Sequence, residues 1–352
     1  MTAPRRRIAI AVGTLAAGLA AAPVALGANA PFSVTVGGFD DARGADLDGF
    51  YPRNAVVREG DTLTFRFGGF HTAVFPARGK KPPEPVRPIG QPTPVTNDPA
   101  GAPYWFTGLP VLGLNPAAFG PIGGKVVNGT KTVGSGVPAG NPATARFTVK
   151  FPKRGVYNVF CALHPNMRGK VTVLPKNRTP PSGAVQKRAA AAQLKADRAS
   201  LRRVIDLARE ATANSATVLI GPGTARTEVF TFFPAKRTVP KGTEVTFRMG
   251  GREEIHTVTF GPTAFLDALS EKTFEGPPTE PVASEGAYPS DPPGAVVSLS
   301  PTTHGNGFLN SGVLTDPGIP GPKAFKVKFD TLGTYDFRCM VHPFMRGTIT
   351  VA

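Results

Sequence analysis

Short stretches of the chain alternate apolar and polar residues, the pattern of strands that bury one face. In the first half Leu63, Phe65 and Phe67 alternate with polar neighbours, and residues 147–151 do the same. The alternation returns at residues 245–249 and 325–329 in the second half. Gly and Pro punctuate these runs and no strand–helix alternation accompanies them. The pattern therefore predicts an all-β antiparallel sandwich or Greek-key barrel.

One segment has a different period. Residues 184–213 contain neither Pro nor Gly and place Leu194, Leu201, Ile205 and Ala208 on one helical face. This spacing predicts a single helix, about 45 Å long at 1.5 Å per residue. A helix of that length either bridges the two halves of the chain or lies across them.

The chain contains one module twice. Residues 145–174 are similar to residues 324–351, and further upstream residues 58–75 are similar to residues 240–260, in the same order. We therefore expect four parts, which are a leader at 1–30, a first domain at 31–174, a basic helical linker at 175–224 and a second domain at 225–352.

Each module also carries a long segment rich in Pro and Gly, at residues 76–142 and 261–322. Loops of this length are uncommon inside compact domains. They are either ordered decorations that cover one end of each barrel or partly mobile flaps. Trp105, the only Trp, lies between Tyr104 and Phe106 in the first of them, where local packing is the more common role of such a trio.

The composition and the N-terminal residues indicate where the protein is located. Gly and Pro (41 and 38 of 352 residues) make up about 22% of the chain, well above the average. Arg5, Arg6 and Arg7 precede an apolar, Ala-rich stretch at 8–26, and Ala28-Asn29-Ala30 forms a cleavage site. This is typical of a secretory leader, with a retained anchor as the alternative. We expect an exported protein of the periplasm, cell envelope or extracellular space, with no membrane span in the mature chain.

The chain is basic throughout, with a net charge of +16 that falls to +13 without the leader. The charge is diffuse, so we expect no nucleic-acid partner. Residues 176–213 concentrate nine basic residues against three acidic ones. This run is either a solvated helix face or a docking surface for an acidic partner or an anionic cell-envelope polymer.

Two cysteines in a chain of this length do not form a disulfide framework. Both occur in the pattern Cys-x2-His-x2-Met, as Cys161-Ala-Leu-His164-Pro-Asn-Met167 and Cys339-Met-Val-His342-Pro-Phe-Met345. Strand alternation directs each sulfur inward. The loop after the strand, restricted by the Pro that follows His, then returns an imidazole and a thioether toward the thiolate.

An earlier strand of each copy ends in a histidine within a repeated His-Thr-x-x-Phe context, at His71 and His256. The second copy has the longer approach, residues 252–255 where the first has Phe70 alone. Two imidazoles, one thiolate and one weak thioether are the donors that select copper for electron transfer. Structural zinc sites seldom include Met. An inert thiol beside core His and Met is the alternative.

With these residues in place, the chain resembles the cupredoxins, the blue copper family of plastocyanin, amicyanin, pseudoazurin and azurin. The short Cys-His-Met loop looks most like that of amicyanin. The resemblance implies an all-β chain of two tandem cupredoxin-like Greek-key domains joined by a long helical linker, with one type 1 copper ion at one end of each. The implied ligands are His71, Cys161, His164 and Met167 for the first copper, and His256, Cys339, His342 and Met345 for the second.

The resemblance implies an electron carrier with unidentified redox partner proteins. In small family members the second His exposes its ring edge through an apolar patch, and here the insertions either cover or rebuild that patch. A module that stores, delivers or senses copper is the alternative. A two-domain copper oxidase or nitrite reductase is less favoured, because only His304 is left for a catalytic copper and we expect it to lie in a loop. We therefore expect no enzyme activity.

Overall fold

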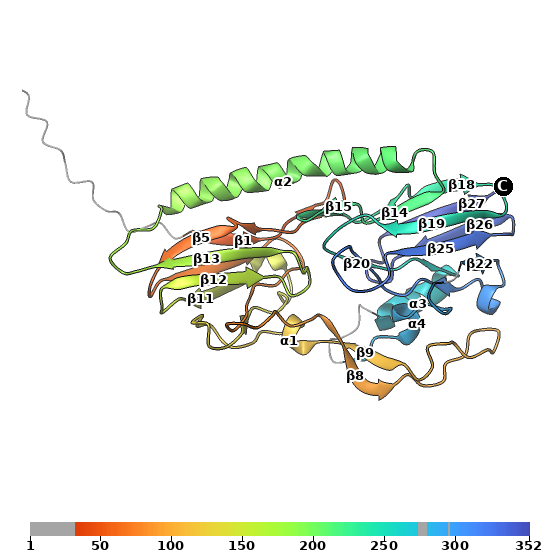
Figure 1. Ribbon diagram of the computed structural model, residues 1–352, viewed down its shortest axis with the longest axis horizontal. Helices are drawn as coiled ribbons and strands as arrows, with labels where there is room; N and C mark the ends of the chain where they lie inside the picture. Colours follow the sequence, from red (N-terminus) through yellow and green to blue (C-terminus); the bar gives the residue numbers. More distant parts are fainter. Residues whose placement is uncertain (1–31, 274–279, 295) are drawn as a thin grey trace, which may run out of the picture.

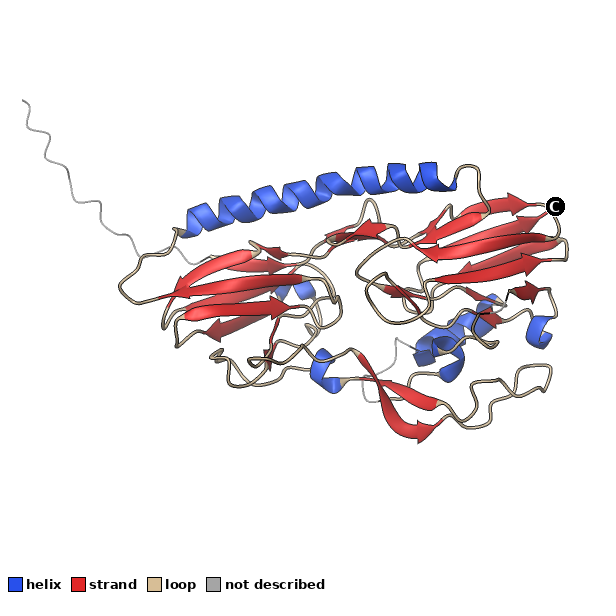
Figure 2. Cartoon of the chain, in the orientation of Figure 1, coloured by secondary structure: helices blue, strands red, loops and turns tan. Residues whose placement is uncertain are grey.

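The computed structural model describes residues 32–273, 280–294 and 296–352, which form two β-sandwiches lying side by side along one long helix (Figure 1). Strands dominate both bodies, and the helices lie at their periphery (Figure 2). The leader expected at residues 1–30 lies outside the described residues.

The first sandwich is built from two sheets with the strand orders β11-β6-β1-β4 and β10-β7-β12-β13-β5. The strands of the first sheet are β1 Ser33–Val36, β4 Phe50–Tyr51, β6 Thr62–Phe67 and β11 Arg146–Lys150. Those of the second sheet are β5 Asn54–Arg58, β7 Val74–Phe75, β10 Val133–Gly134, β12 Gly155–Phe160 and β13 Arg168–Leu174.

The second sandwich repeats this plan with the orders β17-β14-β19-β25-β22 and β18-β27-β26-β21-β23. The strands of its first sheet are β14 Thr217–Ile220, β17 Phe232–Phe233, β19 Thr243–Met249, β22 Val297–Leu299 and β25 Ala324–Phe329. Those of its second sheet are β18 Lys236–Val239, β21 Thr259–Phe260, β23 Leu309–Asn310, β26 Gly333–Arg338 and β27 Arg346–Val351.

Neither sandwich is purely antiparallel. In the first, β1 runs parallel to β6 and β5 parallel to β13, and in the second β14 runs parallel to β19 and β18 parallel to β27. The reason is a crossing of the chain between sheets. Between β1 and β6 the chain passes through β5 in the opposite sheet. When it comes back, β6 lies beside β1 and runs in the same direction.

Strand alternation determines which side chains form each core. In β6 Leu63, Phe65 and Phe67 are buried while Arg66 faces solvent, and β19 repeats this order. The core of each sandwich draws on both of its sheets. Each fully buried Phe contributes about 1.5–3 kcal/mol relative to an exposed one, so the apolar interior is the main source of stability.

A small sheet joins the sandwiches, with the order β15-β16-β3-β2. Its strands are β2 Phe39–Asp40, β3 Ala45–Leu47, β15 Gly223–Thr224 and β16 Thr227–Val229. Strands β3 and β16, from the first and second halves of the chain, pair antiparallel with Asp46 opposite Glu228. The backbone hydrogen bonds of one sheet thus cross the interface between the sandwiches.

The helix α2 (Gly183–Thr212) runs along both sandwiches and passes over this small sheet (Figure 1). Its N-terminus is capped by Ser182, whose hydroxyl accepts a hydrogen bond from the Val185 amide. Leu201 is fully buried and packs in a cluster with Ala45 and Leu47 of β3 and Val229 of β16. The helix therefore lies across both sandwiches and covers the small sheet between them.

The two Pro/Gly-rich segments are ordered where the structure describes them, and they pack on each other. The first contains the hairpin β8 (Val86–Pro92) and β9 (Pro110–Leu114), which reaches beneath the second sandwich (Figure 1). There the Trp105 indole N–H donates to the Pro289 carbonyl, 2.6 Å away. The remaining elements are α1 Pro116–Phe119, α3 Thr263–Thr273, α4 Ser284–Ala287, β20 Ile255–His256, β24 Leu314–Thr315 and the 3-10 turns Pro142–Thr144 and Thr303–Gly305.

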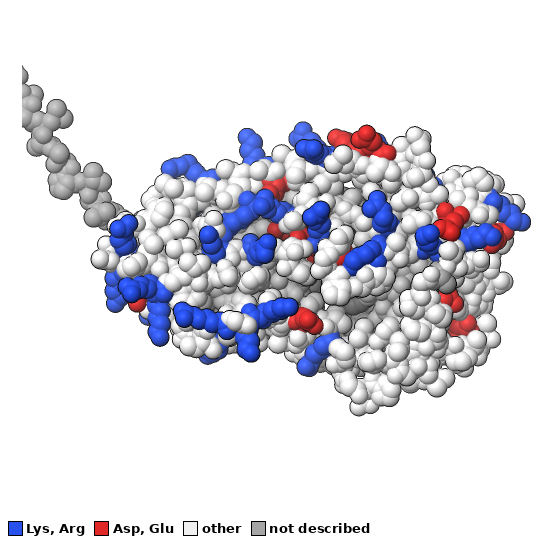
Figure 3. Space-filling view, viewed as in Figure 1, with Lys and Arg blue, Asp and Glu red and all other residues white. Residues whose placement is uncertain are grey.

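Basic side chains are spread over α2, the first sandwich and the joint between the bodies, with acidic ones scattered among them (Figure 3). On this face the basic side chains are spread out and are not gathered in one patch (Figure 3). Within the described ranges, none of the helices combines the length and the apolar character that a membrane crossing requires.

Candidate metal centre

The first set of sequence-predicted ligands converges at one end of the first sandwich. His71 follows β6, Cys161 directly follows β12, and His164 and Met167 lie in the loop before β13. The His71 and His164 Nδ1 atoms are 2.9 Å apart, and the Cys161 sulfur is 3.3 Å from His164 Nδ1. All four residues are buried, with at most 4% of their surface exposed.

The second set converges in the same manner but less tightly. The Cys339 sulfur lies 3.7 Å from His256 Nδ1 and 3.9 Å from His342 Nδ1, and the two nitrogens are 3.2 Å apart. Met345 is buried in the same core cluster as Cys339, as Met167 is with Cys161. In both sets the Nδ1 edges of the imidazoles face the sulfur.

Two backbone hydrogen bonds close each loop and explain why a seven-residue segment can supply three donors. The Cys161 amide donates to the Met167 carbonyl over 3.0 Å, and the Met167 amide donates to the His164 carbonyl over 2.9 Å. Cys339, His342 and Met345 repeat both bonds at 3.0 and 2.8 Å. Because the turn is tied to itself, the spacing in the sequence becomes a fixed spacing of side chains.

Each sulfur also accepts a backbone hydrogen bond that the sequence analysis did not identify. The Thr72 amide lies 3.4 Å from Cys161 Sγ, and the Thr257 amide lies 3.3 Å from Cys339 Sγ. Both threonine hydroxyls accept from the amide that follows the cysteine. The signal was present as the repeated His-Thr pair, and its physical role is to hold the sulfur against the first histidine.

The outer edge of each first histidine meets a buried carboxylate, which sequence reasoning also missed. Asp46 Oδ1 lies 3.2 Å from His71 Nε2, and Glu228 Oε1 lies 2.7 Å from His256 Nε2. Such a carboxylate holds the proton on Nε2 and leaves Nδ1 free to bind a metal. These acids are also the pair that face each other across β3 and β16.

Glycine makes room for this arrangement. Gly37 and Gly221 both have positive φ (66° and 54°), and a Cβ at either would lie within 2.4 Å of an imidazole ring atom, of His71 or His256 respectively. Only glycine combines that backbone conformation with so close an approach.

The second histidines are linked through one residue, Glu254. Its Oε1 lies 2.7 Å from His164 Nε2 and its Oε2 lies 3.8 Å from His342 Nε2. Glu254 belongs to residues 252–255, the longer approach to His256 that distinguishes the second copy. The added residues therefore extend from the second sandwich to the ligand set of the first.

The two sets differ in the charge that their donors carry. Burial opposes ionisation of Cys161, but His164 and His71 next to the sulfur lower the pKa of that thiol well below its usual range. At the second set burial raises the pKa of the Cys339 thiol to about 11. Burial and the neighbouring His342 lower the pKa of His256 well below its usual range. A metal entering the second set would therefore displace a thiol proton.

The donor chemistry fits copper. In each set the cysteine sulfur and the two imidazole nitrogens all lie within 4.8 Å of one another, in buried positions. A buried thioether accompanies them, and this combination suits copper better than zinc. The fifth histidine, His304, lies apart, 2.9 Å from Asp98 and 3.3 Å from Asp291, and it belongs to neither set.

Comparison with known proteins gives a match to one curated relative, amicyanin from Paracoccus denitrificans. It is 41% identical over 45 residues, which are 13% of this chain and 34% of that protein. The chain thus matches about a third of the length of this relative. No family model matches.

Solved structures of similar proteins include plastocyanin from Dryopteris crassirhizoma, at 26% identity over 39% of this chain and 99% of that one, with a TM-score of 0.22. Another is a purple cupredoxin from Nitrosopumilus maritimus, at 17% identity over 39% of this chain and all of that one, with a TM-score of 0.22. Amicyanin from Paracoccus versutus is 19% identical over 41% of this chain and 88% of its own, with a TM-score of 0.23. The chain is thus similar to amicyanin over 45 residues, and it carries the Cys-His-Met loop twice.

Proposed function

We propose that this protein carries electrons, with one type 1 copper ion in each sandwich. His71, Cys161, His164 and Met167 would hold the first ion, and His256, Cys339, His342 and Met345 the second. When bound, each copper supplies reversible one-electron chemistry. The observation that carries the proposal is the repeated convergence of one cysteine sulfur and two Nδ1 atoms beside a buried methionine.

The chain's own residues keep each donor set fixed. Thr72 and Thr257 hold the sulfurs, Asp46 and Glu228 hold the first imidazoles, and the loop hydrogen bonds hold the second imidazoles. A set of donors that does not rearrange when the charge of its centre changes avoids the energetic cost of reorganisation. This rigidity favours transfer over storage.

An external partner would reach the protein at His342. The side chain of His342 is 15% exposed, compared with 5% for His164. Phe230 stacks on the His342 ring at 4.6 Å, and Phe344, 62% exposed, lies beside both. We infer that a redox partner docks on this aromatic patch, because its rings lie directly beside the His342 imidazole.

Substitution Phe344→Ser tests this docking site. It is expected to slow reduction of the protein by a protein donor several-fold while both copper spectra stay unchanged, because the residue is not a ligand. Val156→Ser, which alters an equally exposed apolar residue on β12, serves as the control. Equal rates in the two variants would contradict docking at Phe344.

Export belongs to this proposal. The secretory pattern of residues 1–30 would bring the chain to the periplasm, cell envelope or extracellular space, where the partner would also be. The proposed role is that of a carrier, without enzyme activity.

The decisive experiment combines metal analysis with visible and electron paramagnetic resonance spectra of the purified protein. Two copper ions per chain with type 1 signals are expected. Cys161→Ser should remove one of these signals and Cys339→Ser the other. Storage as Cu(I) would give neither colour nor reversible redox chemistry, and a type 2 signal would favour a copper enzyme. Either result would overturn the proposal.

A further inference from the structure

Six carboxylates gather in the interface between the sandwiches, and the copper sites do not use all of them. Each is at most 7% exposed. They come from both halves of the chain, in the neighbourhood of β3, β16, β20 and β24, and they are Asp46, Asp48, Glu228, Glu253, Glu254 and Asp316.

Three of these acids have a clear task. Asp46, Glu228 and Glu254 accept hydrogen bonds from the outer edges of the imidazoles. Glu253 and Asp316 each use one oxygen, which accepts from the Asn166 amide and from the Glu254 amide respectively.

Five fully buried oxygens of these acids have no hydrogen-bond partner from the protein. They are both oxygens of Asp48, Glu228 Oε2, Glu253 Oε1 and Asp316 Oδ1. Asp48 is the most notable, because its carboxylate is 2% exposed and wholly unpaired. An Asp48 oxygen lies within 4.8 Å of an Asp46 oxygen and of a ring nitrogen of both His71 and His164, so the side chain points into the cluster.

Among the described residues, no Lys or Arg side chain pairs with the cluster, and the imidazoles of His71 and His164 pair with Asp46 and Glu254 alone. Within the described part of the chain, no Lys or Arg nitrogen lies within 4.0 Å of any of these six carboxylates. Arg53 and Arg226, which line the adjoining cavity, are engaged by Asp197 instead. An unpaired buried carboxylate costs several kcal/mol, so each of these acids is stabilised either by its own proton or by a bound cation.

We propose that this interfacial carboxylate cluster binds a hard divalent cation of the calcium or manganese class, with Asp48 as its principal ligand. Oxygen donors without a free sulfur or imidazole nitrogen favour such cations over copper or zinc. The Nε2 atoms nearby are occupied as hydrogen-bond donors to Asp46 and Glu254. The site is therefore distinct from both copper sites, and it would hold the two sandwiches together across their interface.

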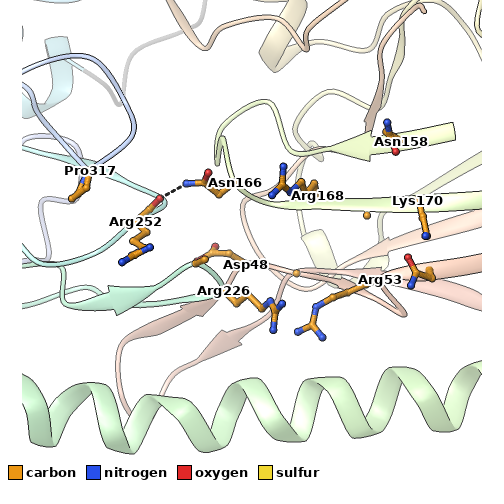
Figure 4. A pocket seen from close by; sticks show the side chains of 13 residues that line it. Asp48, Arg53, Asn158, Asn166, Arg168, Lys170, Arg226, Arg252 and Pro317 are labelled. Carbon is orange, nitrogen blue, oxygen red and sulfur yellow. Dashed lines mark hydrogen bonds between the residues drawn. The ribbon is translucent and has the colours of Figure 1, made fainter.

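A cavity of about 590 Å³ between the sandwiches adjoins the site. Asp48 lies on its wall next to Asn166 and Arg252, with α2 passing along one side (Figure 4). None of the proposed copper ligands lines this cavity.

The test uses the intact, copper-loaded protein after treatment with a calcium chelator. Titration calorimetry with Ca²⁺ and electron paramagnetic resonance with Mn²⁺ are expected to show one cation bound per chain in addition to the two coppers. Asp48→Asn should weaken this binding at least about tenfold, because it replaces the one carboxylate with two free oxygens. Asp98→Asn, a buried acid near His304, should bind as the unaltered protein does.

Type 1 spectra and circular dichroism show whether each variant is folded and loaded, and Ca²⁺ should raise the melting temperature of the unaltered protein more than that of Asp48→Asn. Three outcomes would overturn the inference: no binding of either ion, equal binding in both variants, or a third copper in place of the cation. Since copper loading is measured separately, failure here leaves the electron-carrier proposal standing.

Discussion

At the scale of single residues, the two halves of the chain use different acids to hold the first histidine of each ligand set. Asp46 and Glu228 both hold the outer nitrogen of a first histidine, at 3.2 and 2.7 Å. Burial opposes ionisation of Asp46, but the adjacent His71 lowers the pKa of its carboxyl below the usual value. Burial and nearby Asp316 raise the pKa of Glu228 well above the usual range. Asp46 is thus the acid that carries a negative charge.

This difference predicts unequal effects on reduction potential. Asp46→Asn should raise the potential of the first copper by on the order of tens of millivolts, because a nearby negative charge that stabilises Cu(II) is lost. Glu228→Gln, the matched change at the second site, should shift its potential less. Voltammetry of calcium-free protein measures both. A larger shift for Glu228→Gln would contradict the assigned charges.

At the scale of elements, the segment 252–255 before β20 joins the two ligand sets. It brings Glu254 between His164 and His342, and it brings Glu253 to the amide of Asn166 in the first loop. In a single-domain carrier, electrons would leave through the solvent-facing ring edge of the second histidine. Here the corresponding edge of His164 faces the segment 252–255, so it contacts the second sandwich and not solvent.

We expect Glu254→Ala to slow electron exchange between the two coppers by tenfold or more while both type 1 spectra remain. The physical reason is the loss of the contact that links the imidazoles. Met167→Gln in the same background separates the two potentials, because an amide oxygen stabilises Cu(II) more than a thioether does. Pulse radiolysis then follows each centre. Glu253→Ala, which does not touch an imidazole, is the control, and equal rates in both would exclude this route.

The helix α2 is the second connecting element, and its apolar face can be tested directly. Leu201 is fully buried against β3 and β16, whereas Leu207 on the same helix is 53% exposed. Leu201→Ala should reduce the free energy of unfolding by about 2–5 kcal/mol, and Leu207→Ala should change it little. Denaturant unfolding compares the two. Similar losses would mean that the helix does not pack on the joint.

At the scale of the whole molecule, the interface between the sandwiches is a buried acidic layer inside a protein of net charge +16. Basic residues occupy the outer surface (Figure 3). Burial raises the pKa of Asp48 to about 8, of Glu253 to about 8 and of Asp316 to about 7. Unfolding releases these groups to water, where they ionise near pH 4.

Stability of the calcium-free protein should therefore depend on pH. Because these acids hold protons more tightly in the folded state, stability is greatest below about pH 4 as far as they are concerned and falls as pH rises toward 8. Added Ca²⁺ should flatten this decline, since the ionised carboxylates then bind the cation. Thermal melting between pH 4 and 8, with and without Ca²⁺, measures it. An increase in stability over this range without Ca²⁺ would contradict the raised pKa values.

The sequence by itself determined the features that depend on neighbours along the chain. The spacing of Cys161, His164 and Met167 survives in the structure because two hydrogen bonds close the loop locally. The strand alternation and the helix at 183–212 follow from periodicity alone, and duplication identified His71 and His256 by their shared context.

Only the tertiary structure decided what lies around these residues. Asp46 is 25 residues from His71, and Glu254 lies 90 residues from His164, in the other sandwich. No spacing rule connects such pairs, because their contact depends on β3 pairing with β16 and on the packing of α2. The packing of the two Pro/Gly-rich insertions could not be predicted either, since Pro and Gly specify turns but not the surface on which a loop packs. Short segments of the sequence specify the donor residues, whereas the surroundings of those residues arise from contacts between segments that are distant in the sequence.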